Sequence, residues 1–331
     1  MAAVVASIAL LVVAMLLALS LGSEPVSLVR ALTDPASLDR ALVTEARLPR
    51  VLLAAVSGGG LSIVGAAFQG LLRNPLAAPY VLGVSGGSAL GATLVIALGL
   101  STASLLGALL LPVAALSAGL AATLLVYAIA RRAGGDGGAR GANILLAGVI
   151  VNGLASAAIT LVKALVSAAK AQELLFWLMG FLDVPAWHSL AAVSACVVVG
   201  SAMLASDAAA LNVLSLGQEP AAHLGVDVRR LERRVFFASS LVVGAIVCVT
   251  GLIGFVGLVV PHALRLVVGP DHRKILPLSL LSGATALVAC DLGSRLIFRA
   301  LGTEPPVGAI TALIGGPVFL ALFVRRGASD V

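Results

Sequence analysis

Few residues of this chain could do chemistry, and the most suggestive of them surround Ser85. Gly83, Ser85 and Gly87 match the G-x-S-x-G pattern that presents a serine nucleophile on a sharp turn. With His262 in another apolar segment, the pattern would fit an intramembrane serine protease. Glycine supplies 36 of the 331 residues, so a match this short arises readily by chance. We expect Ser85 instead to lie at a helix start that lines a wide pathway.

Acidic residues within apolar segments would indicate an ion-coupled carrier, because such carriers use them as proton or ion relays. Asp291 is the one acidic residue that we place within a span, and it lies near a charged end of that span together with Arg295. An ion-coupled secondary transporter is therefore a poor alternative.

Nucleotide, metal and cofactor sites are not predicted. No phosphate-binding G-x-x-x-x-G-K-[ST] motif occurs, and the glycine-rich stretch at 134–138 has no lysine, so the chain should not hydrolyse ATP or act as an enzyme. The three cysteines lie in apolar runs and the four histidines are scattered, so we expect no disulfide, no metal and no cofactor in this chain.

The composition places the chain in a membrane. Sixty per cent of its residues are hydrophobic, 11% are charged, and the mean hydropathy is +1.13. The formal charge of +6 does not indicate nucleic-acid binding, because no basic cluster is interleaved with aromatic residues. Membrane proteins use such cations to set their topology.

The apolar runs predict an all-α polytopic membrane protein with about ten transmembrane helices in a single domain, 1–331. A bilayer core needs about 20 apolar residues for each helical span. The first run is too long, and lacks the basic start, for a signal peptide, so we expect a retained span. The expected spans are 1–22, 51–72, two within 74–130 with a turn inside 99–107, 141–162, 184–206, two within 235–264, 275–294 and 305–324.

The cations favour an orientation with both termini in the cytoplasm. Thirteen fall on the inner side and eight on the outer side, and an inner excess is the usual pattern. The inner set is Arg73, Arg131, Arg132, Arg140, Arg229, Arg230, Arg233, Arg234, Arg265, Arg273, Lys274, Arg325 and Arg326. The outer set is Arg30, Arg40, Arg47, Arg50, Lys163, Lys170, Arg295 and Arg299, which is many for an outer face and favours a docking surface there.

One long polar stretch, SLGQEPAAHLGVDVRRLERR at 215–234, interrupts the apolar sequence. Its apolar positions fall roughly at helical spacing and Gly225 lies among them, which predicts two short amphipathic helices broken at that glycine. An element of this kind between spans would lie on the cytoplasmic face. It is either a solvated loop or a surface presented to a partner.

Several motifs resemble the permeases of binding-protein-dependent ABC importers for iron-siderophores, haem and vitamin B12. They cover nearly the whole chain in the family's order, and they are RLPR, QGLLRNPLAAPYVLGVSGG, ILLAGV, LSLGQEPAAHLGVDVRRL, GLIGFVGLVVPHALR, DHRKILP and PPVGAITALIGGPVF. The resemblance implies the vitamin B12 permease-like fold of a type II ABC importer. A fainter similarity relates 60–65 to 251–257, and inverted repeats are common in transporters.

The resemblance also implies partners and their sites. A coupling segment at 215–231 would seat an ATPase subunit through Leu216, Gly217, Glu219, Ala222, His223, Leu224, Gly225 and Val226. Arg47, Arg50 and Arg295 would grip acidic residues of a substrate-binding protein, since guanidinium suits bidentate pairing with carboxylates. The stretch from Arg295 to Glu304 is longer than the family pattern, so Arg299 is an alternative to Arg295.

Two copies of the chain would then enclose one pathway in a bacterial cytoplasmic (inner) membrane, in contact with lipid. Two cytoplasmic subunits would bind ATP and magnesium, and a periplasmic or extracytoplasmic binding protein would deliver the substrate. The implied pathway and gate residues are Gly141, Ala142, Asn143, Ser85 and Asn152. Small apolar walls favour haem, with ferric siderophore and cobalamin left open.

Overall fold

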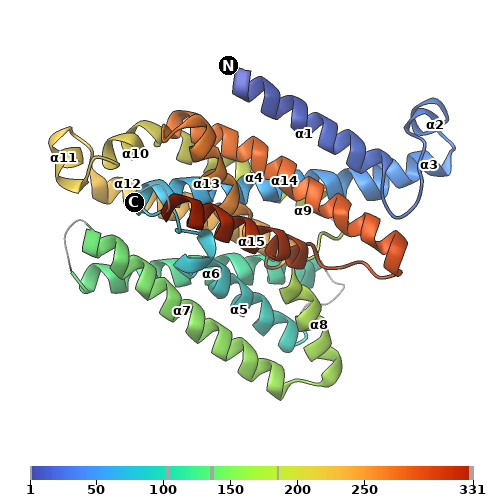
Figure 1. Cartoon of the computed structure of the whole chain (residues 1–331). Coiled ribbons are helices and arrows are strands. Elements are labelled where there is room, and N and C mark those ends of the chain that lie inside the picture. The colour runs from blue at the N-terminus through green and yellow to red at the C-terminus, as the bar shows by residue number, and fades with distance from the viewer. Residues whose placement is uncertain (1, 101–104, 135–137, 185, 328–331) are drawn as a thin grey trace.

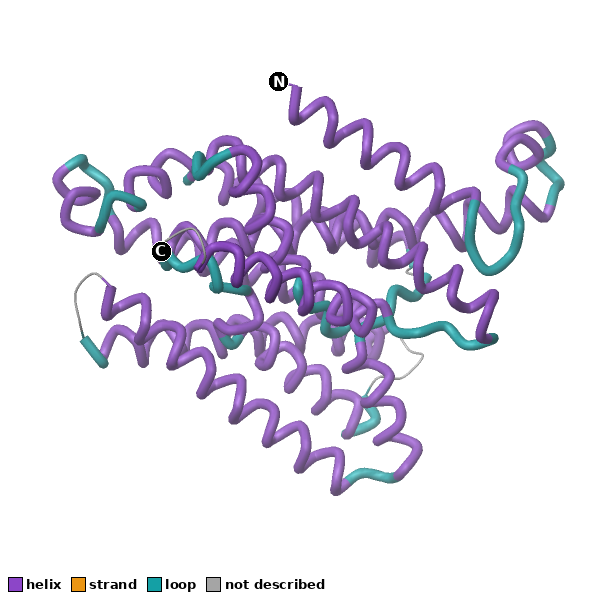
Figure 2. The backbone as a smooth tube through the Cα atoms, viewed as in Figure 1, coloured by secondary structure: helices purple, strands orange, loops and turns teal. Residues whose placement is uncertain are grey.

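The computed structural model describes the backbone of residues 2–100, 105–134, 138–184 and 186–327, and this part of the chain is helical without strands. Figure 1 shows the helices packed side by side, and Figure 2 shows that short loops join them. In chain order the elements are α1 (Ala2–Ser20), α2 (Leu28–Thr33), α3 (Leu38–Ala41), the π-helical turn η1 (Leu42–Arg47), α4 (Leu48–Leu71), the 3-10 turn η2 (Pro79–Leu82), α5 (Val84–Ala97), α6 (Leu105–Arg132), α7 (Gly138–Leu165), α8 (Ala168–Met179), α9 (Trp187–Ser206), α10 (Ala208–Leu214), α11 (Gln218–His223), α12 (Val228–Thr250), α13 (Val256–Val268), α14 (His272–Leu301) and α15 (Val307–Gly327).

Ten apolar helices correspond to the ten expected spans, and the fold is an all-α polytopic one as predicted. Within the described residues, seven helices are long and apolar enough to cross a membrane. Three shorter apolar helices, α5, α13 and the 307–321 part of α15, complete the ten. The turn expected inside 99–107 lies between α5 and α6, and its residues 101–104 fall outside the described residues.

Helix α4 forms the centre of the bundle because glycines let its neighbours approach its backbone. A Cβ added at Gly58 would collide with the carbonyl oxygen of Gly283 on α14, and one at Gly65 would collide with that of Gly257 on α13. Small residues permit this close packing where lipid supplies no hydrophobic drive between helices. The two similar segments, 60–65 and 251–257, therefore pack against each other.

A short non-helical break at 251–255 separates α12 from α13, which confirms two helices within 235–264. Gly251 has a left-handed φ of 65°, which glycine adopts without steric cost, and its α-carbon lies against the carbonyl of Trp177 at the end of α8. The first turn of α15 meets the same place, where the Gly308 N–H donates to the Gly180 carbonyl at 3.1 Å. Three distant segments thus close around this break.

The bundle has two distinct ends. Helices α10 and α11 project at one end, called the α11 end below, while α2 and α3 project at the opposite end, called the α3 end (Figure 1). The α3 end holds the segment between the first two spans, in which α2 and α3 are short helices. It also holds η1, whose wider turn leads without interruption into α4.

Candidate functional site

The predicted coupling segment forms a compact helical elbow at the α11 end. Helix α11 is one of the two short helices expected, and Gly225 follows it with a left-handed φ of 85°. Asp227 caps the next helix by accepting from the Arg230 N–H at 2.9 Å. The second short helix was predicted wrongly, because the chain after Asp227 continues as α12 for 23 residues. A polar face at the start of a long span hid that continuity.

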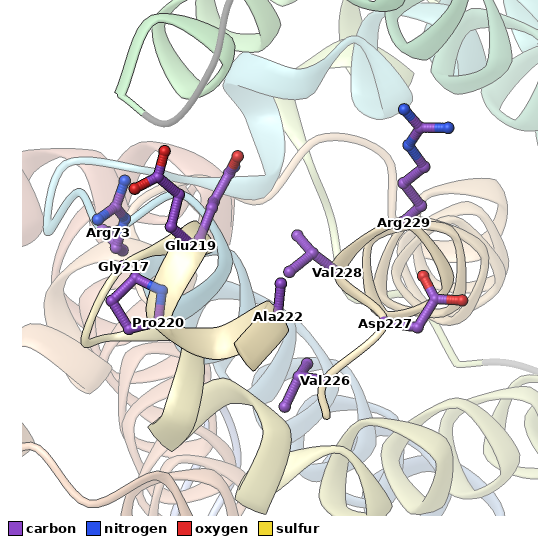
Figure 3. Close-up of a pocket in the computed structure, with 10 residues that line it drawn as sticks. Arg73, Gly217, Glu219, Pro220, Ala222, Val226, Asp227, Val228 and Arg229 are labelled. Carbon is purple, nitrogen blue, oxygen red and sulfur yellow. The ribbon is translucent and has the colours of Figure 1, made fainter. Parts of the chain in front are cut away.

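A groove with a cavity volume of about 770 Å³ runs along this elbow (Figure 3). Its floor is small and apolar, formed in part by Ala222 and Val226. It is lined by Arg73, Gly217, Gln218, Glu219, Pro220, Ala222, Val226, Asp227, Val228 and Arg229. Two acids and two arginines among these residues border an apolar floor, which suits an amphipathic helix with charged flanks of both signs.

Several predicted coupling residues around the groove point away from the bundle. Leu216 and Leu224 keep 65% and 63% of their surfaces exposed, and His223 is also exposed. Gly217 is buried with a φ of 125°, a conformation that favours glycine. These two exposed leucines beside the groove are available for contact with another molecule.

A hydrogen-bonded relay fastens this elbow to the centre of the bundle. On α10, Asn212 Oδ1 accepts from the backbone N–H of His272 at 2.8 Å and also lies 2.8 Å from its Nδ1. His272 Nε2 lies 3.3 Å from Arg265 Nη2, which donates to the Ala66 carbonyl of α4 at 3.2 Å. These bonds link α10 to α14, α13 and α4. No sequence pattern predicted this relay, because its members come from four separate helices.

The same asparagine holds an acidic cap at the start of α14. Asn212 Nδ2 donates to Asp271 Oδ1 at 2.7 Å, and the Arg273 N–H donates to the same oxygen at 3.0 Å. These bonds, with the Asn212 bond the stronger cause, hold the pKa of Asp271 below its usual range. The cap is therefore ionised throughout the neutral pH range.

The predicted gate residues lie in the first turns of α7 at the α11 end. Gly141 faces α4, since a Cβ there would lie 3.5 Å from the Leu72 carbonyl. Asn143 Nδ2 donates to the Gly134 carbonyl at 2.8 Å and Ala142 is exposed. The structure thus places the three predicted gate residues together at the start of α7, at the same end of the bundle as the elbow.

Ser85 and Asn152 lie at the junction of α5 and α7. Asn152 Nδ2 donates to the Tyr80 carbonyl, and its Oδ1 lies against Gly86, where a Cβ would collide with it. The hydroxyl of Ser85 is 2% exposed and has no hydrogen-bond partner in the described part of the chain. A serine nucleophile needs a base within hydrogen-bond reach, so this geometry favours the packing role over the protease.

At the α3 end, the three arginines predicted to dock a binding protein are engaged inside the chain. Arg47 caps the end of α1 by donating through Nη1 to the carbonyls of Leu19 and Ser20 at 2.8 and 3.0 Å. Arg295 is 4% exposed and donates to the Ala18 carbonyl at 2.9 Å. Both side chains therefore hold the first helix in place.

The third arginine, Arg50, joins an ion cluster with two carboxylates that the sequence did not reveal as its partners. Its Nη2 lies 2.7 Å from Asp291 Oδ1 and also pairs with Glu304. Asp291 Oδ2 lies 3.0 Å from Arg295 Nε, one helical turn away. Within this cluster, only the pairing of Asp291 with Arg295 could be anticipated from the sequence, because their (i,i+4) spacing places them on one face of α14. Arg299, one turn further along α14, is exposed.

Comparison with known proteins decides the family. Residues 10–325 match the model of the FecCD transport family. The chain belongs to this family.

The similar FecCD relatives are transport permeases. The chain is 46% identical over 275 residues to the cobalamin import system permease protein BtuC of Halobacterium salinarum, covering 83% of this chain and 71% of that one. It is 37% identical to the hemin transport system permease protein HmuU of Yersinia pestis, over 83% and 80% of the two chains. A solved metal-chelate type ABC transporter in an inward-facing conformation superposes with a TM-score of 0.86 at 33% identity, covering 97% of this chain and 98% of that one.

As a FecCD member the chain is a multi-span permease subunit of an ABC importer, as the motifs predicted. Importers of this class take ATPase and substrate-binding subunits as partners. The non-enzymatic role of the family agrees with the unpartnered hydroxyl of Ser85.

Proposed function

We propose that two copies of this FecCD permease form one pathway and that a separate ATPase subunit docks in the groove at the α11 end of each copy. The observation that carries the proposal is the groove itself, which combines an apolar floor, charges of both signs and a hydrogen-bonded relay into α14, α13 and α4. Closure of the ATPase subunits would move α11, and the relay would pass that movement to the bundle. ATP and magnesium stay with the partner subunit.

The α3 end would then face outwards and receive the substrate-binding protein, with both chain termini of the permease in the cytoplasm. Arg299 is exposed while Arg295 serves α1 and Asp291, which supports Arg299 as the arginine that reaches the partner from α14. The Arg50 side chain is 15% exposed, and it can contact the binding protein once its pairing with Asp291 or Glu304 changes.

For the substrate we propose a metal tetrapyrrole, the class that contains both haem and cobalamin. Two relatives carry the names of cobalamin and hemin permeases. Ser85 and its neighbours on α5 are packed against other helices, so the proposed substrate class rests on the names of these relatives. A pathway with small apolar walls would pass a large ligand without holding it tightly.

Reconstitution tests the whole proposal. The permease, its ATPase and its binding protein are placed in liposomes, and uptake of haem, cobalamin and a ferric siderophore is measured with and without ATP. We expect uptake of one tetrapyrrole that requires ATP and both partner subunits. Uptake that proceeds without ATP would contradict the importer mechanism, and uptake of the siderophore alone would contradict the substrate class.

The coupling role is tested in the same liposomes by reversing charge at Glu219 and Asp227 together. Both acids line the groove and are exposed. Asp227 also caps α12, so its change to lysine should cost about 0.5–2 kcal/mol of stability, which thermal unfolding of the variant monitors. We expect ATP hydrolysis to be uncoupled from uptake, or the ATPase subunit to dissociate. Arg233→Glu, an exposed charge on α12 that does not line the groove, serves as the control.

A further inference from the structure

The two carboxylates of the ion cluster at the α3 end differ in burial and in attachment. The Asp291 side chain is 1% exposed, lies within α14 and pairs with both Arg50 and Arg295. The Glu304 side chain is 31% exposed and lies in the non-helical segment 302–306, where it pairs with Arg50. Asp291 is thus built into the helix core, whereas Glu304 reaches the cluster from a loop at the surface.

The loop around Glu304 is fixed on one side and free to turn on the other. Ser294 Oγ donates to the Pro305 carbonyl at 2.6 Å, and Pro306 restricts the chain further before α15. On the other side, Gly302 ends α14 with a left-handed φ of 71°. A rotation confined to 302–304 can therefore withdraw the Glu304 carboxylate without moving α14 or α15.

We propose that Glu304 is a replaceable latch on Arg50, and that a carboxylate of the docked substrate-binding protein takes its place. This inference rests on the proposed function. Asp291 and Glu304 both pair with the Nη2 atom of Arg50, and Glu304 is the more exposed of the two, so an incoming carboxylate that pairs with this atom displaces Glu304 rather than Asp291. Docking of the binding protein and withdrawal of the loop at 302–304 would then occur together.

Charge identifies the partner as an acidic surface. The cluster combines the two guanidinium groups of Arg50 and Arg295 with the two carboxylates of Asp291 and Glu304. Withdrawal of Glu304 leaves one carboxylate against two cations in a half-buried site, and such a site takes up an anionic group. The exposed Arg299 adds a further positive charge on the same helix.

If Glu304 is such a latch, loss of its charge should strengthen docking of the binding protein, whereas loss of a residue that itself contacts the binding protein should weaken docking. Docking of the wild-type protein must break the Glu304–Arg50 pair, so Glu304→Gln should tighten docking by roughly three- to tenfold. Glu304→Asp keeps the charge but shortens the side chain by one methylene, and it should tighten docking by a smaller factor. Glu45→Gln is the matched control, because Glu45 is an exposed acid of η1 at the same end and forms no ion pair within the described residues.

The experiment measures the Kd of the purified binding protein for the assembled permease–ATPase complex in nanodiscs, together with thermal unfolding of each variant. The expected order of affinity is Glu304→Gln, then Glu304→Asp, then the wild type, with Glu45→Gln close to the wild type. Equal effects of Glu304→Gln and Glu45→Gln, or wild-type affinity for Glu304→Asp, would show that only long-range charge matters and would overturn the latch. Weaker docking of Glu304→Gln would overturn it as well.

Failure of the proposed function gives a different result. If the wild-type complex binds no substrate-binding protein at all, the docking role of the α3 end is wrong. If it binds normally and the variants rank otherwise, only the latch is wrong. Should Glu304→Gln unfold early, the charge-preserving Glu304→Asp still decides the question.

Discussion

Asn212 and Asp271, 59 residues apart in the chain, are joined by a hydrogen bond of 2.7 Å from Nδ2 to Oδ1. The bond fastens α10, which leads into the coupling elbow, to the first turn of α14. Because the same asparagine also accepts from the His272 N–H, one side chain carries both connections. One side chain thus fastens α10 to the start of α14, beside the covalent path from the groove through α12.

Asn212→Leu should therefore loosen the coupling elbow, since it keeps the branching of the side chain but removes its hydrogen-bonding groups. The substitution leaves the His272 N–H without its acceptor, a loss worth about 1–3 kcal/mol of unfolding free energy. We expect fewer substrate molecules imported per ATP hydrolysed, measured in proteoliposomes, and a lower unfolding temperature in detergent. Ser215→Ala, which removes an exposed local hydrogen bond nearby, is the control. An unchanged ratio of substrate uptake to ATP hydrolysis would show that the relay does not contribute to coupling.

Filling the groove should prevent assembly with the ATPase subunit. Ala222 lines the groove and is exposed, so Ala222→Trp would occupy its floor without disturbing the bundle. Co-purification of the ATPase subunit should be lost or strongly reduced. Ala209→Trp adds the same bulk to the exposed side of α10, outside the groove, and should assemble normally. Equal assembly of both variants would place the ATPase elsewhere.

Ser85 distinguishes a pathway from a catalytic nucleophile. Ser85→Ala removes a buried hydroxyl that has no partner among the described residues, so uptake and stability should be close to those of the wild type. Ser85→Trp should cost about 1–3 kcal/mol or more through overpacking against the α5–α7 junction, with loss of uptake. ATP-dependent uptake in proteoliposomes measures both. Complete loss of function in Ser85→Ala would instead support the interpretation of Ser85 as a catalytic nucleophile.

Arg295 and Arg299 should respond oppositely to charge reversal. Arg295→Glu places a third carboxylate beside Asp291 and Glu304 and should destabilise the fold by on the order of 3–5 kcal/mol. Arg299→Glu changes an exposed side chain, so stability should stay within about 0.5 kcal/mol while docking of the binding protein weakens roughly two- to tenfold. Thermal unfolding and a docking Kd separate the two effects. Wild-type docking by Arg299→Glu would argue against its role.

Because helices pack closely against the glycines of α4, a glycine-to-alanine change there should lower the stability of the protein instead of raising it. Alanine in a helix interior normally gains up to about 1 kcal/mol over glycine, and Gly153→Ala should show this, because a Cβ there meets nothing within 4 Å. Gly65→Ala should instead destabilise by about 1–3 kcal/mol, because its methyl group would collide with the Gly257 carbonyl. Thermal unfolding of both variants in one detergent is the test, and stabilisation of both would disprove the close contact.

The apolar runs predicted the ten helices because the bilayer dictates the length and polarity of every span. Glycines in the middle of the 235–264 run favoured two helices over one tilted helix, and the observed break at 251–255 lies among them. Span length and turn chemistry could not predict the ion cluster, because Arg50 and Asp291 are 241 residues apart in the chain. The two residues meet only because α4 packs against α14. The extended α12 was missed because its first turns are polar at the groove and its remainder is apolar.

The junction of Gly180, Gly251 and Gly308 also bears on how the chain is made. Gly308 begins the last helix, and its N–H satisfies a carbonyl that was synthesised more than one hundred residues earlier. Until α15 has left the ribosome and entered the membrane, the end of α8 and the break before α13 lack this cover. Packing at this junction is therefore completed only when the last of the ten apolar helices is in place.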